Sequence, residues 1–241
     1  ILNIIYYISL SMFIVQLVLI LSLIFTIYNI IEIKKYNKNG IIIEYSNNFI
    51  KEIDNIKKNI QQLNPVLLTV KNADIDLQTL ITKNLSYNIE DLGYSMKKIN
   101  DKNNKTIIKN KKIFSDLCEG KINFENEIIH TSQIPLIKKQ SISIIKGYYL
   151  SPLEFCKHNY NIIYLLDGDV TMYLFNPKHK QEILGKSLES IKKYSHKYHL
   201  KKDNLLIIPT NWYYIQESTE SILEYHCDSD NIFCVLYNMI R

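Results

Sequence analysis

The side chains that could carry chemistry are scattered along this chain of 241 residues. Its four cysteines are Cys118, Cys156, Cys227 and Cys234. They include no CxxC pair, so the sequence predicts neither a disulfide framework nor a zinc knuckle. The pattern closest to a metal motif, His226-Cys227-Asp228, is interpreted as a surface turn. The sequence contains no G-x-S-x-G elbow, P-loop, G-x-G-x-x-G or H-E-x-x-H motif, so no common catalytic template applies.

Three further histidines and one pair of acids are also interpreted as surface features. His196-Lys197-Tyr198-His199 spaces two histidines three residues apart, but its lysine-rich surroundings indicate a polar loop. His158 stands alone, and a lone histidine of this kind is expected to be solvated. Asp167 and Asp169 flank Gly168 and resemble a carboxylate pair, but acids in a turn usually face solvent. No reaction follows from these residues alone.

A long uncharged segment at the start of the chain gives the strongest physical signal. No Asp, Glu, Lys, Arg or His occurs before Glu32, and residues 12–31 are almost all apolar. A helix needs about 20 apolar residues to cross about 30 Å of hydrocarbon. The segment is too long for a signal peptide and lacks the polar face of a core helix. We therefore predict a transmembrane helix at residues 1–33, which would anchor the protein in a lipid bilayer.

The charges that follow this segment predict the orientation. Lys34, Lys35 and Lys38 come directly after it, within a linker assigned to residues 34–43. The positive-inside tendency then predicts a single-pass protein whose C-terminal domain lies on the cytoplasmic side. The net charge of +5 is small and dispersed, so no nucleic-acid partner is expected. The bias toward isoleucine, asparagine and lysine is typical of A+T-rich coding.

The first part of the domain at residues 44–241 has helical periodicity. Apolar residues recur at spacings of four and three and so form one face of a predicted helix; they are Phe49, Ile53, Ile56, Ile60 and Leu63. Pro65 ends this helix. A short strand is predicted at 66–70, and a second helical pattern runs from Leu77 to Leu85. Residues 97–112 are predicted to form a loop with marginal strands. We therefore expect residues 44–120 to be mainly helical.

The second part, residues 135–241, has the character of short β-strands. Ser141 to Ile145 alternates, and Ile162 to Phe175 is predicted to form a hairpin around Asp167-Gly168-Asp169. A helical excursion is predicted at 186–193. Four more strands are predicted at 205–208, 212–216, 222–225 and 232–237. Helices followed by many short strands predict an α+β protein built on an antiparallel double-stranded β-helix, a barrel with flanking helices.

Three segments within the barrel resemble the JmjC-like, cupin-like oxygenases in order and spacing. They are Ser151-Pro152-Leu153, the stretch from Asn161 through Gly168 to Leu174-Phe175-Asn176-Pro177, and Ile208-Pro209 followed by Trp212-Tyr213-Tyr214. The family has a T-P-L-H-x-D segment, a hairpin ending in L-F-x-P, and an I-P-x-x-W-W-H strand. The resemblance implies a cupin-like barrel. Together with the A+T-rich bias it suggests a large DNA virus as the source.

The family's iron site is degenerate in this sequence. Its members bind iron through two histidines and one carboxylate, with positions open for 2-oxoglutarate and oxygen. Counting from the two flanking motifs places the His-x-Asp ligands on either Glu154 and Cys156 or Phe155 and Lys157. The third ligand falls on Tyr214, and the lysine that would pair with 2-oxoglutarate falls on Val170. His158, Asn161 and Trp212 remain as possible pocket residues.

Besides a plain membrane anchor whose soluble part only assembles with itself or with a capsid or organelle membrane, two functional interpretations follow from the resemblance. The first is a membrane-anchored cupin-like protein without catalysis, metal or cofactor, acting as a binding or structural module for an unidentified protein partner. The alternative is a divergent Fe(II)- and 2-oxoglutarate-dependent hydroxylase with displaced ligands such as Glu154, Cys156 or His158. The two differ in whether such side chains converge inside the barrel.

Overall fold

The computed structural model describes the barrel as a continuous stretch and the rest of the chain in parts. The described residues are 11–24, 26–27, 43–45, 54–56, 58–60, 62–70, 96–98, 105–108 and 137–230. The helix predicted from Leu77 to Leu85, the strand predicted at 232–237, Cys118 and Cys234 lie outside these residues.

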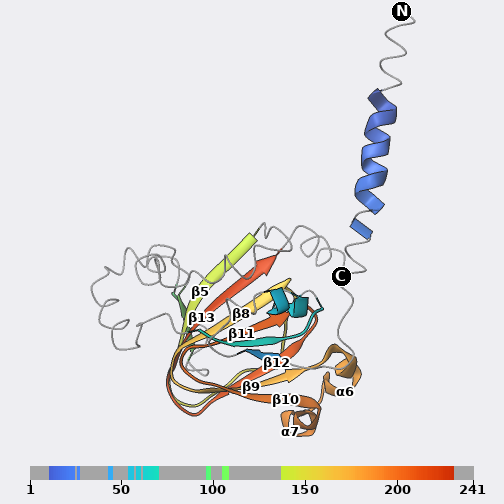
Figure 1. Ribbon diagram of the computed structural model, residues 1–241. Helices are drawn as coiled ribbons and strands as arrows, with labels where there is room; N and C mark the ends of the chain where they lie inside the picture. Colours follow the sequence, from blue (N-terminus) through green and yellow to red (C-terminus); the bar gives the residue numbers. More distant parts are fainter. Residues whose placement is uncertain are drawn as a thin grey trace, which may run out of the picture.

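Two sheets, antiparallel apart from the parallel pair of β1 and β2, face each other in the barrel (Figure 1). The larger sheet has the order β1-β2-β11-β8-β13-β5-β4-β3. Its strands are β1 (Ile43–Tyr45), β2 (Val66–Thr69), β3 (Met96–Lys98), β4 (Lys105–Ile108), β5 (Ile137–Ile145), β8 (Tyr160–Asp167), β11 (Asn204–Pro209) and β13 (Ile222–Asp230). The smaller sheet has the order β10-β9-β12-β6, and β7 also pairs with β12. Its strands are β6 (Tyr149–Leu150), β7 (Glu154–Phe155), β9 (Val170–Phe175), β10 (Ser195–Leu200) and β12 (Tyr213–Ser218).

The strand pairing is nested, which defines the topology. β5 pairs with β13, β6 and β7 pair with β12, β8 pairs with β11, and β9 pairs with β10. Strands from the two ends of the barrel sequence therefore pair with each other, and the chain doubles back between β9 and β10. β6 and β7 share one position beside β12, so these nine strands fill the eight positions of a jelly roll, which is a double-stranded β-helix. The predicted class of short antiparallel strands in two facing sheets is confirmed.

Successive side chains of a strand point to opposite faces of its sheet, and those that point inward fill the space between the two sheets. A core cluster of apolar side chains comes from both sheets, including Ile163 and Leu165 of β8 and Met172 and Leu174 of β9. Trp212, directly before β12, is fully buried in this cluster. Its indole Nε1 donates to the backbone oxygen of Leu63, 3.0 Å away. This contact connects the barrel to the segment preceding β2.

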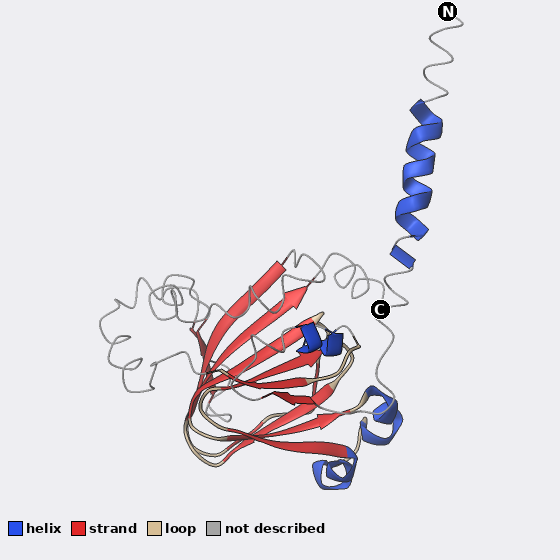
Figure 2. Ribbon diagram, in the orientation of Figure 1, coloured by secondary structure: helices blue, strands red, loops and turns tan. Residues whose placement is uncertain are grey.

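The smaller sheet carries short helices on its outer face (Figure 2). They are η1 (Pro177–His179), α6 (Lys180–Ile183), α7 (Leu188–Ile191) and η2 (Lys192–Tyr194), all within the β9–β10 connection. Ile183 and Ile191 are buried against Tyr173, Tyr213 and Ile215 of the sheet. The helical excursion predicted at 186–193 is therefore present as α7 and part of η2.

The predicted hairpin at 162–175 is wrong. β8 and β9 lie in different sheets, and Gly168 belongs to the connection that passes between them. Gly168 has φ +83°, and a Cβ there would lie 2.7 Å from the backbone oxygen of Ser221. Glycine is thus required both by the left-handed backbone and by the close approach of the chain before β13. The turn signal was correct, but a turn does not determine whether its flanking strands pair.

Two segments interpreted as loops or turns are strands. His196-Lys197-Tyr198-His199 lies in β10, which pairs along its whole length with β9. His226-Cys227-Asp228 lies within β13, which pairs with β5 and with β8. Pairing with neighbouring strands has overridden the polar local sequence in both cases.

The region predicted as mainly helical, 44–120, also contributes strands. Residues 54–56 and 58–60 are helical, and Ile56 and Ile60 are buried as their spacing indicates. The structure additionally places β1, β2, β3 and β4 here, extending both edges of the larger sheet. β2 corresponds to the strand predicted at 66–70.

The uncharged N-terminal segment is helical over residues 11–24 and 26–27. Its large apolar side chains are exposed; Phe13 is 62% and Leu19 is 63% accessible. Among the described helices, none combines the length and the hydropathy required to cross a membrane. The transmembrane helix at residues 1–33 stays a prediction.

Replacement of Trp212 by alanine tests the packing of the barrel. We expect Trp212→Ala to lower the free energy of unfolding by about 3–5 kcal/mol, because it leaves a cavity between the sheets. Leu184→Ala, at a position that is 46% exposed, should cost far less. Trp212 is the only tryptophan of the chain, so denaturant unfolding should be followed by circular dichroism. Equal stability of the two variants would contradict the packing described here.

Candidate functional site in the barrel interior

The register between β7 and β12 brings two of the predicted site residues together. Glu154 pairs with Tyr214, and directly opposed residues of antiparallel strands point to the same face. The Tyr214 hydroxyl donates a hydrogen bond to Glu154 Oε2, with the oxygens 2.7 Å apart. A phenol and a carboxylate therefore occupy two of the positions where the resemblance implies iron ligands.

Asn161 of β8 joins this pair from the opposite sheet. Its Nδ2 donates to the Tyr214 hydroxyl, 3.1 Å away, so the phenol oxygen both accepts and donates. Asn161 is only 7% exposed. Within the described part of the chain its Oδ1 has no hydrogen-bond partner. Three strands thus contribute to one hydrogen-bonded set, which we call the tyrosine network (Glu154, Asn161 and Tyr214).

Burial controls the protonation of Tyr214. Removal from water is the main reason that its pKa lies well above the usual 10.0, because burial disfavours the phenolate. The negative charge of Glu154, the hydrogen bond to it and the charge of Asp228 act in the same direction. Tyr214 is therefore a neutral hydrogen-bond donor at physiological pH.

His158 is not solvated as expected but lies between two aspartates of β13. Its Nδ1 is 2.8 Å from Asp230 Oδ2, and its Nε2 is 3.4 Å from Asp228 Oδ2. The backbone N–H of Asn159 also donates to Asp230 Oδ1, over 3.2 Å. We call this set the aspartate clamp (His158, Asp228 and Asp230). Both ring nitrogens of His158 face carboxylates.

A further buried acid of β13 was missed by the sequence analysis. Glu224 is fully buried, and its Oε2 accepts a hydrogen bond of 2.6 Å from Gln216 Nε2 on β12. Its other carboxylate oxygen lies 2.8 Å from His226 Nε2. Glu224, His226, Asp228 and Asp230 recur at every second position, a pattern that places them on one face of β13. This alternation of polar residues was the available signal, and the interpretation of 226–228 as a turn concealed it.

The other predicted site residues lie elsewhere. Cys156 is buried, with its sulfur 3.4 Å from the backbone oxygen of Ile208. Phe155 points outward and packs on the ring of Tyr213 at 4.8 Å, and Lys157 is exposed. Val170 belongs to the apolar core cluster together with Trp212. Of the two residue pairs that could correspond to the family's His-x-Asp ligands, the structure directs Glu154 and Cys156 toward the interior.

This donor set does not fit ferrous iron. The iron of the family requires two imidazoles and one carboxylate on one face, whereas the corresponding positions hold Glu154, Cys156 and Tyr214. The carboxylate already accepts the phenol's hydrogen bond. His158, the nearest imidazole in sequence, is held by Asp228 and Asp230. Across the described residues, no three His, Cys, Asp or Glu side chains are grouped so that they could hold a metal ion.

Comparisons with known proteins find similarity only among solved structures. No family model and no curated protein matches the chain. The Schizosaccharomyces pombe Cnp3 cupin domain is 17% identical over 43% of this chain, with a TM-score of 0.31. A cupin superfamily protein from Desulfitobacterium hafniense is 8% identical over 39%, with a TM-score of 0.30, and the Drosophila melanogaster CENP-C cupin domain is 10% identical over 38%, with a TM-score of 0.28. The matches span 58%, 68% and 59% of those chains, respectively.

The class of the protein follows from its own strand order. Nested pairing of β5 to β13 in two sheets defines the jelly roll, the class that includes the cupins. The barrel is therefore cupin-like. Its polar groups include the tyrosine network, the aspartate clamp and Glu224.

Removing the Tyr214 hydroxyl tests the tyrosine network. We expect Tyr214→Phe to lower the free energy of unfolding at pH 7 by about 1–3 kcal/mol, because Glu154 and Asn161 each lose a buried partner. The raised pKa adds a pH dependence: the unfolded chain releases this proton near pH 10, whereas the folded chain retains it. Wild-type stability should therefore fall more steeply above pH 10 than that of the variant.

Tyr194→Phe serves as the matched control, since it removes a hydroxyl from a half-buried tyrosine on the outer face of the barrel. Urea unfolding at several pH values measures all three proteins. Identical pH dependence for wild type and Tyr214→Phe would contradict the proposed role of the hydroxyl.

Proposed function

We propose that this chain is a membrane-anchored, JmjC-related jelly-roll protein in which the barrel acts as a binding or structural module and not as an iron oxygenase. One observation carries the proposal: the hydrogen bond from Tyr214 to Glu154 lies where the resemblance implies two of the iron ligands. A neutral phenol is a poor substitute for imidazole, and its hydrogen bond engages the carboxylate that would bind metal.

The position implied for 2-oxoglutarate recognition supports the same proposal. Val170 stands where the family has a lysine, and its side chain is packed in the apolar core. An apolar side chain offers no charge or hydrogen bond to a carboxylate. The chain thus lacks the family's groups for both the metal and the co-substrate, and the polar residues of the interior instead bind one another.

The membrane anchor is supported by the sequence and by exposure. Residues 12–31 carry no charge, and the described helical residues 11–24 expose their large apolar side chains. Such a surface needs an apolar environment, which a bilayer provides. Lys34, Lys35 and Lys38 would place the barrel on the cytoplasmic side. Its partner there would be a protein, and no nucleic acid is proposed.

The alternative function, a divergent hydroxylase with displaced ligands, draws on one observation. Glu154 and Cys156 face the interior, as a displaced ligand pair would. His158 would have to leave the aspartate clamp to join them. Titration with metal and co-substrate separates the two functions.

The titration uses the whole chain in detergent micelles, prepared without oxygen. Mn(II) and 2-oxoglutarate are added singly and together while thermal unfolding is followed. We expect no shift from the combination, because the barrel lacks the ligand set. A ligand at a hundredfold excess over its dissociation constant would add about 2.7 kcal/mol, which is easily detected. An active oxygenase of this type provides the positive control.

A stabilisation that needs both additions would contradict the proposed loss of catalysis. In that case Glu154→Gln should remove the shift if the alternative function holds.

Membrane anchoring is tested by fractionation of cells that express the chain. We expect it to remain in the membrane pellet after extraction at alkaline pH. Leu19→Arg combined with Ile20→Arg should move it to the supernatant, because each arginine at the centre of a span costs about 2.5–3.5 kcal/mol. The matched control, Leu19→Ile with Ile20→Leu, should stay in the pellet. Extraction of the unmodified chain would overturn the anchor.

A further inference from the structure

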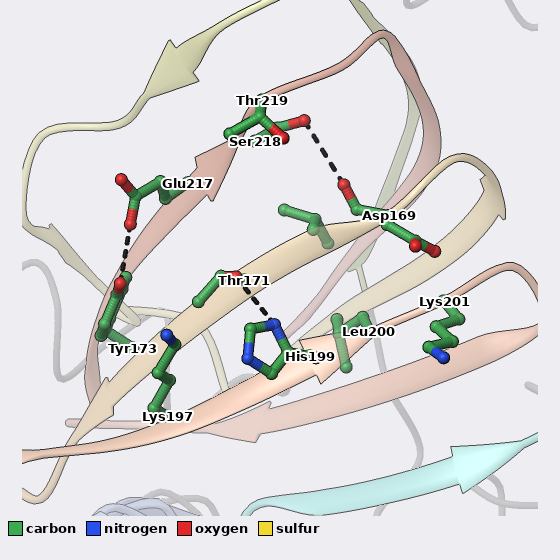
Figure 3. Close-up of a pocket in the computed structure, with 11 residues that line it drawn as sticks. Asp169, Thr171, Tyr173, Lys197, His199, Leu200, Lys201, Glu217, Ser218 and Thr219 are labelled. Atoms are coloured by element: carbon green, nitrogen blue, oxygen red, sulfur yellow. Dashed lines mark hydrogen bonds between the residues drawn. The ribbon is translucent and has the colours of Figure 1, made fainter.

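The outer face of the smaller sheet carries a groove next to the short helices. Its volume is about 430 Å³, and it is lined by β9, β10 and β12 and by residues next to their ends (Figure 3). The helices pack on the same face around Tyr173 and Ile215, but none of their own residues lines the groove. A volume of this size accommodates a small organic ligand. The groove shares no residue with the tyrosine network or the aspartate clamp.

The strand register aligns polar side chains across the floor of the groove. His199 of β10 and Glu217 of β12 both pair with Thr171 of β9, so the three side chains form one row on this face. The neighbouring row on the same face holds Lys197 beside Tyr173, with the lysine Nζ 5.9 Å from the centre of the ring. Because strand pairing fixes both rows, the sheet itself determines the shape of the groove.

Basic side chains form one side of the groove. Lys197, His199 and Lys201 follow one another at every second position, and all three are exposed (Figure 3). Among the residues that the structure describes, neither lysine has a carboxylate within ion-pair distance. The His199 Nδ1 is 3.0 Å from the Thr171 hydroxyl, and the Nε2 takes no part in that contact. Two ammonium groups and one imidazole nitrogen therefore offer donors to an anion.

The surrounding sequence strengthens the positive potential on this side. Residues 177–202, which contain the short helices and β10, carry eight lysines and two glutamates, a net charge of +6. The whole chain carries only +5, so this segment is more positive than the entire protein. A concentration of charge of one sign attracts ligands of the opposite sign. The groove therefore favours an anion, and the argument does not depend on any single lysine.

Hydrogen-bond acceptors form the opposite side of the groove. They are the carboxylates of Asp169 and Glu217, with Thr219 beside them (Figure 3). Glu217 Oε2 accepts a hydrogen bond of 2.7 Å from the Tyr173 hydroxyl, which fixes the carboxylate against the floor. An ionised carboxylate only accepts hydrogen bonds. This side therefore suits a ligand group that donates them.

The separation of charge across the groove selects among ligands. A ligand with acids at both ends would place one of them beside Asp169 and Glu217, where like charges repel. A ligand ammonium would compete with Lys192, whose pKa is raised by its hydrogen bond to Glu189 and also by the nearby charge of Glu217. Neutral hydroxyl groups avoid both conflicts and supply the hydrogen that a carboxylate oxygen accepts. The complementary ligand is therefore anionic at one end and carries hydroxyl groups at the other.

We propose that this groove binds a phosphorylated polyol. The phosphate lies between Lys197, His199 and Lys201, and hydroxyl groups of the polyol donate to Asp169 and Glu217. A phosphate monoester carries a charge of about −1.5 to −2 at pH 7 and three acceptor oxygens, which match the donors of the basic side. Soluble sugar phosphates and the headgroups of phosphorylated inositol lipids share this chemistry. The groove lies outside the barrel, so the proposal does not depend on whether the interior binds iron.

Calorimetric titration of the whole chain in uncharged detergent micelles tests this proposal. The phosphorylated probes are glucose 6-phosphate and inositol 4-phosphate, and the matched probes are glucose, inositol and inorganic phosphate. We expect saturable binding of a phosphorylated polyol, about tenfold or more tighter than that of the free polyol or of inorganic phosphate, because only the complete ligand contacts both sides of the groove.

Two variants assign the two ends of the ligand. Lys197→Ala combined with Lys201→Ala should weaken the phosphorylated polyol about tenfold or more and should weaken inorganic phosphate as well. Asp169→Ala should weaken the phosphorylated polyol severalfold without weakening inorganic phosphate, because it removes only an acceptor for hydroxyl groups. The matched control, Lys180→Ala with Lys186→Ala, removes the same charge from exposed residues outside the groove and should change both affinities by less than about twofold.

Bilayer nanodiscs distinguish the two sources of the ligand, using the proposed membrane anchor. The chain is reconstituted in phosphatidylcholine alone, with phosphatidylinositol 4-phosphate, or with phosphatidylserine at matched charge, and glucose 6-phosphate is titrated into each. Competition by the inositol lipid but not by phosphatidylserine would assign a lipid headgroup. Equal affinity in all three bilayers would assign a soluble sugar phosphate.

Three outcomes would overturn the proposal. Absence of saturable binding by both phosphorylated probes would exclude the site. Equal affinity for these probes and for inorganic phosphate would leave only charge attraction. Equal weakening by the control pair and by the Lys197 and Lys201 pair would show that net charge, and not the groove, determines binding. Failure here would leave the metal titration of the barrel unaffected, so the proposed function is tested separately.

Discussion

Side chains alternate across every β-strand, and in this protein that alternation determines what the barrel contains. The nested pairing of β5 to β13 closes two sheets around a common interior, so every second residue of each strand is removed from water. Apolar residues fill most of that space, among them the fully buried Trp212. Each polar residue placed there must find a partner, because an unpaired buried group destabilises the fold.

The polar interior satisfies this constraint mostly from within the barrel. Tyr214 hydrogen-bonds to Glu154 and Asn161, Glu224 to Gln216, and His158 is held by two aspartates of β13. Such mutual pairing uses the donors and acceptors that a metal site would leave directed at its ion. This mutual pairing is the basis on which we propose a binding role for the barrel.

Local patterns predicted many elements but not their pairing. The alternating run before Ile145, the strand at 66–70 and the buried faces of Ile56 and Ile60 follow from periodicity and were predicted. The Gly168 turn was also recognised, but it joins two sheets, because the choice of partner depends on strands distant in sequence. β10 and the end of β13 were missed since their polar residues resemble loops. The contacts of His158 with Asp228 and Asp230 span about seventy residues, and no spacing rule reveals them.

The state of the Tyr214 phenol tests the central claim most directly. Tyrosines labelled with carbon-13 at the ring carbon that bears the hydroxyl can be followed by NMR between pH 7 and 12, with Tyr214 assigned by its loss in Tyr214→Phe. Exposed tyrosines should titrate near pH 10. Tyr214 should keep its protonated resonance through that range, because burial and Glu154 raise its pKa. Titration of Tyr214 together with the exposed tyrosines would contradict a buried, hydrogen-bonded phenol at this position.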